Sequence, residues 1–219
     1  VPGNLLGWSA LVERFGTRRF SDLLAPAIEL ARDGVPLTAF SANEIAVTID
    51  LMRAKGDELF AHWARIYSDR GELPRTGYVL RQPALARTFE AIASEGIGYL
   101  YGGPLGRALV EMVSAHGGWL SMEDLEEAKA EWLAPLAARY RDLTVHVPPP
   151  PCEAFQHLLT LRILDGTDLG AFEHNSPDHL DTVFRAIRLA AITRIENNLP
   201  TPDETARLLS DEAVERLRE

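Results

Sequence analysis

The chain has 219 residues, of which 46% are hydrophobic and 25% charged, and its formal net charge is −10. This balance is typical of a folded globular protein and excludes a disordered chain, a collagen and a disulfide-stabilised miniprotein. An acidic surface repels phosphate groups, so nucleic acid is not expected as a partner. No apolar run reaches the ~18 residues of a membrane-spanning helix, so no membrane partner is expected either.

The cysteine content and the first residues bear on processing and compartment. Cys152 is the single cysteine, which excludes an internal disulfide and a multi-thiolate metal site. The opening Val1-Pro2-Gly3-Asn4 lacks the basic and apolar regions of a signal peptide, and it carries no initiator methionine. We therefore expect a processed product or an excised segment. The sequence leaves the compartment open between cytoplasm and periplasm.

Apolar residues at helical spacing dominate the first half of the chain. Glycines end the segments, and polar side chains can begin them: Ser21 is predicted to cap a helix whose first turn contains Asp22. In chain order we expect a helix from Leu5 to Phe15, a helix from Ser21 to Gly34, a helix from about Thr38 to Lys55, a loop from Asp69 to Gly77 and a helix from Gln82 to Glu95.

The second half is predicted to be mainly helical as well. Ser121 and Asp124 have the spacing of a capping box, with Asp in place of the usual Glu. In chain order we expect a helix from Leu105 to Ala115, a helix from Ser121 to about Glu131, a helix with Ala154, Leu158, Leu161 and Leu164 on one stripe, a helix from His179 to Asn197 and a last helix capped by Ser210.

One segment has the period of a strand. Leu143, Val145 and Val147 alternate with polar neighbours, and Pro148–Pro151 removes the backbone donors that pairing would need. Residues 78–80 are a weak second candidate. Since no other alternation stands out, we expect the strand to pair with segments outside this chain. The sequence therefore predicts a mainly α chain with one or two strands.

Candidate catalytic residues are few. Cys152 and His157 could form a thiol–imidazole nucleophile, but five residues apart at a helix start they would lie on different faces. A solitary cysteine is more often a small packed hydrophobe. His174 and His179 are also five apart, which is wrong for a helical zinc site and is better read as a loop and a helix-start histidine.

Two further patterns have structural interpretations that outweigh the functional ones. Residues 102–106, Gly-Gly-Pro-Leu-Gly, precede a helix and could hold an anion at its N-terminus, but they match no phosphate-binding pattern. A tight turn with proline at the helix entry explains them better. Glu126 and Glu127 are adjacent on a predicted helix surface and are interpreted as solvated charges.

Short segments along nearly the whole chain occur in an order that resembles the gamma-glutamyltranspeptidase family. The segments that carry this resemblance are Val1-Pro2-Gly3 with Trp8 and Glu13-Arg14-Phe15-Gly16, Leu24-Ala25-Pro26-Ala27-Ile28-Glu29-Leu30-Ala31-Arg32-Asp33-Gly34, Gln82-Pro83-Ala84-Leu85-Ala86-Arg87-Thr88, Gly98 to Gly103, Gly117-Gly118-Trp119-Leu120-Ser121, Asp124-Leu125, and Trp132 with Pro135-Leu136 and Tyr140-Arg141. Each segment is only moderately specific, and their order is what makes the resemblance strong.

The sequence departs from the family pattern at two places. Cys152-Glu153-Ala154-Phe155 stands where the family usually has Ser-Ser-Gly-Gly, which adds bulk and removes backbone freedom. Ile192-Thr193-Arg194 stands where the family has Ala-Asp-Arg, so an acid is lost. The first change predicts a divergent pocket or a divergent subfamily and weakens an assignment to glutathione.

The resemblance implies an enzyme whose intact fold is a four-layer αββα N-terminal-nucleophile hydrolase, and the strand around Val145 would belong to its sheet. A threonine freed by self-cleavage would transfer or hydrolyse gamma-glutamyl groups, with no metal or organic cofactor. That threonine begins the small subunit, downstream of residue 219, and the arginine for the substrate carboxylate lies upstream of Val1.

Residues 1–219 are thus expected to be a single helical segment of the large subunit. The expected partners are the N-terminal part of the large subunit, the Thr-initiated small subunit and, in the intact enzyme, a small-molecule substrate. No catalytic, substrate-binding or metal residue is predicted within the chain, and the chain alone is predicted to be inactive. The alternative is a non-catalytic helical scaffold or binding module derived from the family, and the presence of a Thr-initiated segment in the parent gene would distinguish the two.

Overall fold

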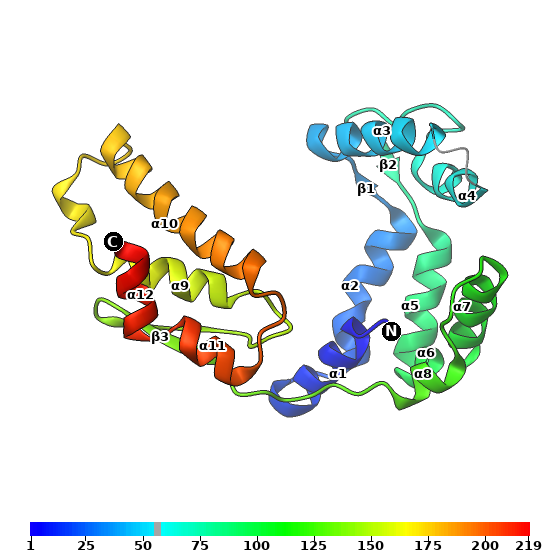
Figure 1. The fold of residues 1–219 in the computed structure, drawn as a ribbon. Helices are drawn as coiled ribbons and strands as arrows, with labels where there is room; N and C mark the ends of the chain where they lie inside the picture. The colour runs from blue at the N-terminus through cyan, green and yellow to red at the C-terminus, as the bar shows by residue number, and fades with distance from the viewer. Residues whose placement is uncertain (55–57) are drawn as a thin grey trace. The chain divides into compact units, whose positions relative to one another are not determined.

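A computed structural model describes residues 1–54 and 58–219, which form two compact units, Val1–Ala130 and Glu131–Glu219. Both units are mainly helical, as Figure 1 shows. In the described residues, no helix is long and apolar enough to cross a membrane. The mainly α class predicted from the sequence is confirmed, and the structure adds short strands to those expected.

The first unit consists of eight helices and two very short strands in its described part. Their bounds are α1 Asn4–Phe15, α2 Phe20–Asp33, β1 Val35–Pro36, α3 Ala39–Arg53, α4 Glu58–Tyr67, β2 Val79–Leu80, α5 Pro83–Glu95, α6 Gly98–Tyr101, α7 Pro104–Ala115 and α8 Met122–Glu127. Helices α2 and α5 pack along one another, and α6 packs against α5, α7 and α8.

The core of the first unit joins both ends of its chain segment. Its buried members are Leu5, Leu24, Ile92, Leu100, Tyr101 and Leu125. The Tyr101 hydroxyl donates a hydrogen bond to the Pro2 carbonyl at 2.7 Å and accepts the Leu6 N–H at 3.3 Å. Burial raises the pKa of Tyr101, which keeps the phenol protonated and able to donate. This phenol therefore fixes the first residues of the chain to the core.

A narrow two-stranded sheet separates α3 and α4 from the rest of the first unit (Figure 1). Val35 pairs with Leu80 and Pro36 with Val79, in antiparallel register. Gly34 precedes this sheet with φ of 96°, and a Cβ there would come within 2.6 Å of the Val79 side chain. The position therefore requires glycine both for its backbone angle and for its close contact.

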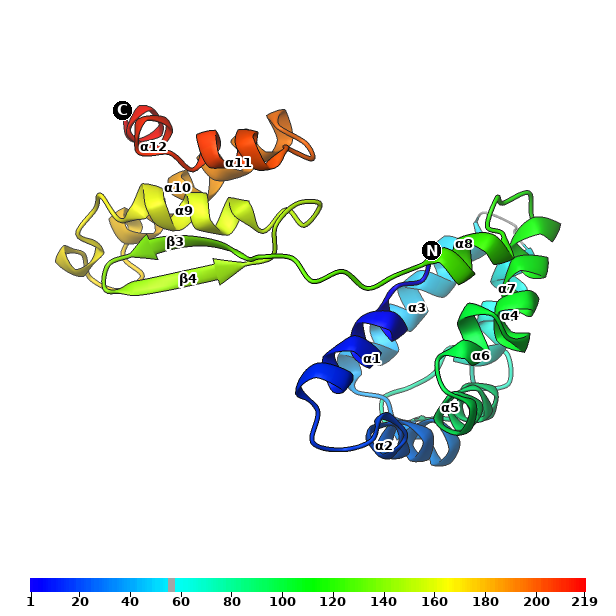
Figure 2. The same ribbon diagram turned by 90° about the horizontal axis from the view of Figure 1, so that it is seen from below.

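The second unit combines one β-hairpin with four helices and a 3₁₀ turn. Their bounds are β3 Leu136–Tyr140, β4 Leu143–Val147, α9 Phe155–Leu164, the 3₁₀ turn Leu169–Ala171, α10 Pro177–Glu196, α11 Pro202–Leu208 and α12 Asp211–Arg218. Helix α9 contacts β3, β4, α10 and α12, and Figure 2 shows it beside the hairpin. The buried core consists of Leu159, Ile163, Leu164, Ala186, Ala190 and Val214.

Strand pairing differs from the sequence-based expectation. The strand at 143–147 is confirmed, but its partner lies within the chain: β3 and β4 pair antiparallel, with Leu136 opposite Val147 and Tyr140 opposite Leu143. The expectation that β4 finds partners only outside the chain is therefore wrong. Within the weak candidate at 78–80, residues 79–80 form a strand, and they pair with residues 35–36.

Helix positions are mostly as predicted, with errors at some ends. Ser121 and Ser210 cap α8 and α12 as expected, and Thr38 caps α3. Ser21 is not a cap, because α2 already begins at Phe20, and α8 ends at Glu127 rather than near Glu131. The predicted end of α3 at Lys55 lies outside the described residues. Helices α4, α6 and α11 were not predicted.

Candidate functional site

The corner between β4 and α9 contains the residues that depart from the family pattern. The Cys152 N–H donates to the Pro149 carbonyl at 3.1 Å, and the Cys152 side chain is exposed. It is therefore not a packed hydrophobe. His157 is exposed on α9, and in the described part of the chain no hydrogen bond joins it to Cys152. The structure thus gives no support to a thiol–imidazole nucleophile.

An ion pair fixes this corner to the C-terminal end of α10. The Glu153 carboxylate lies 2.5 Å from the Arg194 guanidinium, and the Arg194 side chain is only 24% exposed. Pro150, Pro151 and Asn197 line the same recess. Phe155 is buried at the start of α9. The corner is therefore filled by side chains and held from α10.

Sequence reasoning missed this ion pair, although both halves of the signal were visible. One departure from the family pattern introduces an acid at Glu153, and the other removes an acid next to Arg194. In the fold these two changes meet, so Arg194 pairs with a carboxylate from a different element. The acid gained at Glu153, taken together with the acid lost beside Arg194, is the signal that could have indicated this ion pair.

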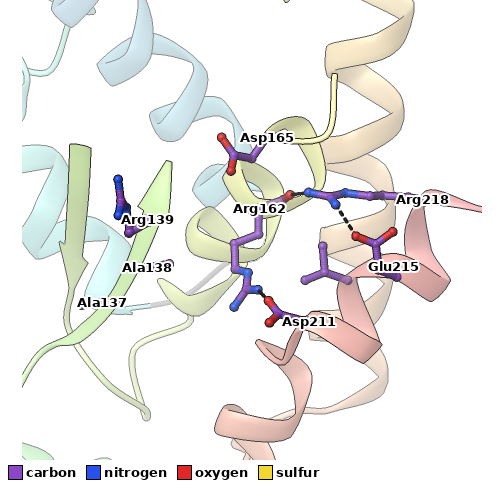
Figure 3. Close-up of a pocket in the computed structure, with 9 residues that line it drawn as sticks. Ala137, Ala138, Arg139, Arg162, Asp165, Asp211, Glu215 and Arg218 are labelled. Atoms are coloured by element: carbon purple, nitrogen blue, oxygen red, sulfur yellow. Dashed lines mark hydrogen bonds and ion pairs between the residues drawn. The ribbon is translucent and has the colours of Figure 1, made fainter. Parts of the chain in front are cut away.

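A highly charged pocket of the second unit lies where β3, α9 and α12 meet (Figure 3). It has a volume of about 470 Å³. Its charged lining consists of Arg139, Arg162, Arg218, Asp165, Asp211 and Glu215. None of these residues was predicted from the sequence, because they come from segments that are remote along the chain.

Most of the charges in this pocket are satisfied by one another or by the backbone. Arg162 pairs with Asp211 and donates to the Leu209 carbonyl. Arg218 pairs with Glu215 at 2.5 Å and donates to the carbonyls of Ile163 and Arg162. Asp165 accepts the N–H of Arg141 at 2.9 Å. The pocket therefore holds no free nucleophile or acid–base pair, and its visible role is to join elements.

The histidine candidates are placed as the structural interpretation predicts. His174 lies in a loop and His179 in the first turn of α10, with ring centroids 5.5 Å apart. The Ser176 side chain caps α10 by accepting the His179 N–H. Among the described residues, no group of three or more His, Cys, Asp or Glu side chains could hold a metal ion.

The glycine-rich segment before α7 is a close-packed turn. A Cβ at Gly103 would lie 2.6 Å from the Tyr99 carbonyl oxygen, and one at Gly106 would lie 2.1 Å from that of Leu100. Pro104 occupies the first turn of α7. These contacts support the tight-turn interpretation over an anion site. Glu126 and Glu127 are exposed on α8, as expected of solvated charges.

The gamma-glutamyltranspeptidase family model matches residues 1–219, the whole chain. The chain belongs to this family. It is 35% identical over 196 residues to the Acylase ACY 1 proenzyme of Pseudomonas sp. strain V22, covering 89% of this chain and 34% of that protein. It is 29% identical over 194 residues to the Glutathione hydrolase-like YwrD proenzyme of Bacillus subtilis, covering 89% of this chain and 36% of that protein.

Solved structures support the same assignment. The cephalosporin acylase from Bacillus halodurans superposes with a TM-score of 0.90 at 28% identity, covering 100% of this chain and 41% of that one. The gamma-glutamyltranspeptidase of Helicobacter pylori superposes with a TM-score of 0.87 at 22% identity, covering 100% and 62%, which shows the shared fold. The fold is that of part of an N-terminal-nucleophile hydrolase, and the chain spans about a third of the length of the two curated relatives.

Proposed function

We propose that residues 1–219 are part of the large subunit of a self-cleaving amide hydrolase or acyltransferase of the gamma-glutamyltranspeptidase family. The observation that carries this proposal is the family match over the whole chain. Relatives named as proenzymes support it, because that name implies a maturation step. The single helical segment expected from the sequence corresponds here to two packing units of that subunit.

In the proposed reaction, the nucleophile is a threonine at the start of the small subunit. Its hydroxyl oxygen attacks the amide carbonyl carbon, and its own amine accepts the hydroxyl proton. The carbon–nitrogen bond of the substrate then breaks, and the proton passes to the leaving amine. Water or an amino acid attacks the resulting ester and restores the threonine. Residues 1–219 contribute packing to this enzyme rather than a reacting group.

The proposed substrate class is an acyl amide that is not restricted to glutathione. Names among the relatives include an acylase, glutathione hydrolases and an oxamate amidohydrolase, which share cleavage of an amide bond. The two Pseudomonas acylases are 35% identical to the chain, and the glutathione hydrolases of Bacillus subtilis and Escherichia coli are 29% identical. The filled corner at Phe155 adds to the case for a divergent substrate.

The deciding experiment expresses the complete reading frame that contains these residues. We expect purified protein to split into two chains, the shorter beginning with threonine by N-terminal sequencing. The matured protein should release a chromophore from gamma-glutamyl or other acyl anilides, and substitution of that threonine by alanine should abolish both cleavage and turnover. Residues 1–219 alone should show no turnover. An uncleaved, inactive full-length protein would favour the non-catalytic scaffold instead.

A second variant tests the nucleophile directly. Cys152→Ala should leave turnover of the matured protein within a few-fold of wild type, because Cys152 is exposed and its backbone makes the hydrogen bond of the turn. Complete loss of turnover with the fold retained would instead support a thiol mechanism.

A further inference from the structure

Two arginines join α9 and α12 in a reciprocal arrangement, which we call the arginine clamp: Arg162 and Arg218 with their partners. Arg162 reaches from α9 to the Leu209 carbonyl and to Asp211 in the first turn of α12. Arg218 reaches back from the last turn of α12 to α9 (Figure 3). Each helix thus supplies a guanidinium to the other side of the seam.

The clamp acts at helix ends, where backbone groups need partners. The last four carbonyl groups of an α-helix accept no hydrogen bond from within the helix. In α9, Arg218 donates to two of these, on Arg162 and Ile163. A cation at this end also complements the helix dipole, and the Asp211 carboxylate does the same at the N-terminal end of α12.

Gly166 makes room for the clamp. A Cβ at this position would lie 2.8 Å from the guanidinium carbon of Arg218 and 2.8 Å from its Nε. Gly166 is not among the glycines that have a positive φ, so its backbone angle does not require glycine. The absent side chain therefore serves the approach of Arg218 rather than a backbone turn.

Apolar contact between α12 and the core is limited. Val214 is its one buried residue, and Ala213 and Leu217 are half-buried. The helix is otherwise exposed and rich in charge, with an outward ion pair between Arg216 and Glu212 at 3.7 Å. The Arg162 and Arg218 side chains, by contrast, are only 24% and 28% exposed. The two arginine side chains are thus partly sheltered in the seam, although their partners Asp211 and Glu215 are exposed.

We infer that α12 is a strap held on α9 mainly by the arginine clamp, and that it opens as a unit when the clamp is weakened. Opening separates the two sides of the charged pocket and uncovers the core around Leu159 and Ile163, which Val214 covers in the closed form. Because the Arg162–Asp211 ion pair crosses the seam and is screened by salt, the opening responds to ionic strength. The seam between α9 and α12 is therefore the point at which the second unit opens first.

Amide hydrogen exchange of the 219-residue chain tests this inference. Arg218→Gln is expected to lower the protection of α12 amides about tenfold, while the amides of α10 keep their protection. Gly166→Ala is expected to have the same effect, because the added methyl displaces the Arg218 side chain without altering any charge. Raising salt from about 0.02 M to about 1 M, where the Debye length falls to about 3 Å, should lower α12 protection a few-fold in wild type.

Two control variants separate the clamp from other causes. Arg216→Gln removes the same charge from the outward face of α12 and should leave protection within about two-fold of wild type. Val214→Ala removes part of the apolar contact and should act less than Arg218→Gln. Unchanged α12 protection in both Arg218→Gln and Gly166→Ala would overturn the inference. An equal loss throughout the second unit would also overturn it, since the strap would then not open separately.

Discussion

The two units of the chain are stabilised differently. In the first unit, side-chain ion pairs are local or weak among the described residues: Arg19 pairs with Asp22 three positions on, and the Arg32–Glu90 pair between α2 and α5 has a separation of 4.0 Å. In the second unit, arginines connect segments that are remote in sequence, as in Arg162–Asp211 and Arg194–Glu153.

This difference follows from the elements that each unit contains. The first unit has several helices whose apolar stripes and glycine contacts allow close packing, so ion pairs contribute little to its tertiary structure. The second unit has an apolar core on α9 and α10, but its short helices α11 and α12 each bury a single side chain, Thr205 and Val214. Charged groups that hydrogen-bond to helix-end carbonyls help to attach these short helices to the rest of the unit. Both units thus have an apolar core, and in the second unit arginines also connect elements that are remote in sequence.

Core truncation should give the largest effects in either unit. Leu125→Ala in the first unit and Leu159→Ala in the second each remove a fully buried side chain, and each should cost about 2–5 kcal/mol of unfolding free energy. Hydrogen exchange should show the loss in α6–α8 for the first variant and in α9–α10 for the second. A much smaller cost at Leu159 would indicate that charge dominates the second unit even in its core.

Glycine substitution should distinguish close helix packing from mere flexibility in the first unit. A Cβ at Gly106 would meet the Leu100 carbonyl at 2.1 Å, so Gly106→Ala should destabilise the first unit by about 1–3 kcal/mol. Gly7→Ala is the matched control within α1, where nothing lies within 4 Å of the added methyl. It should raise stability by about 0.5–1 kcal/mol, measured by denaturant unfolding.

The ion pair at the β4–α9 corner should give a smaller effect. A double-mutant cycle with Glu153→Gln and Arg194→Gln is expected to yield a coupling free energy of about 1 kcal/mol, because Arg194 is sheltered while Glu153 is 55% exposed. The Asp181–Arg185 pair on the surface of α10 is the control and should show weaker coupling, because both side chains are exposed to solvent. Equal coupling in the two cycles would remove the distinction between remote and local pairs.

Acidification should weaken one cap in each unit to a similar, small extent. The N–H of Ser121 donates to Asp124 and lowers the pKa of that carboxyl, and the N–H of Thr201 does the same for Glu204. A lowered folded-state pKa stabilises the fold at pH above the ordinary carboxyl value of about 4 and loses that effect as pH falls through the folded value. The protection factors of α8 and α11 amides, corrected for the pH dependence of intrinsic exchange, should therefore fall in acid, and Asp124→Asn and Glu204→Gln should flatten this dependence.

Local features of the fold were predictable from the sequence, and remote contacts were not. Helices such as α5 and α7 are encoded by apolar periodicity together with proline and glycine at their ends. Strand β3 was missed because Ala137 and Ala138 favour helix. Its turn places Arg141 at φ of 55°, where glycine or asparagine would have been the usual signal. The Asp165 side chain accepts the Arg141 N–H from 24 residues away, which no local pattern indicates.

The candidate site shows the same limit. The departures at Glu153 and near Arg194 were visible as two separate anomalies, but only the fold shows that they meet. The arginine clamp was invisible because arginines on helices are ordinary surface residues, and their carbonyl partners have no sequence signature. The functional inference from the sequence rests on the order of the segments that resemble the family. It does not rest on any residue that could act chemically.

The small sheet of β1 and β2 determines where insertions and deletions could be accepted during evolution. The Leu37 N–H donates to the Tyr78 carbonyl at 2.8 Å, and the Gly77 N–H donates to the Leu37 carbonyl at 2.8 Å, so the backbone enters and leaves the α3–α4 region at one place. These hydrogen bonds hold the two ends of the α3–α4 segment together. The entropy cost of closing such a segment changes only slowly with its length. Insertions or deletions could therefore remodel the α3–α4 segment while α2 and α5 keep their packing.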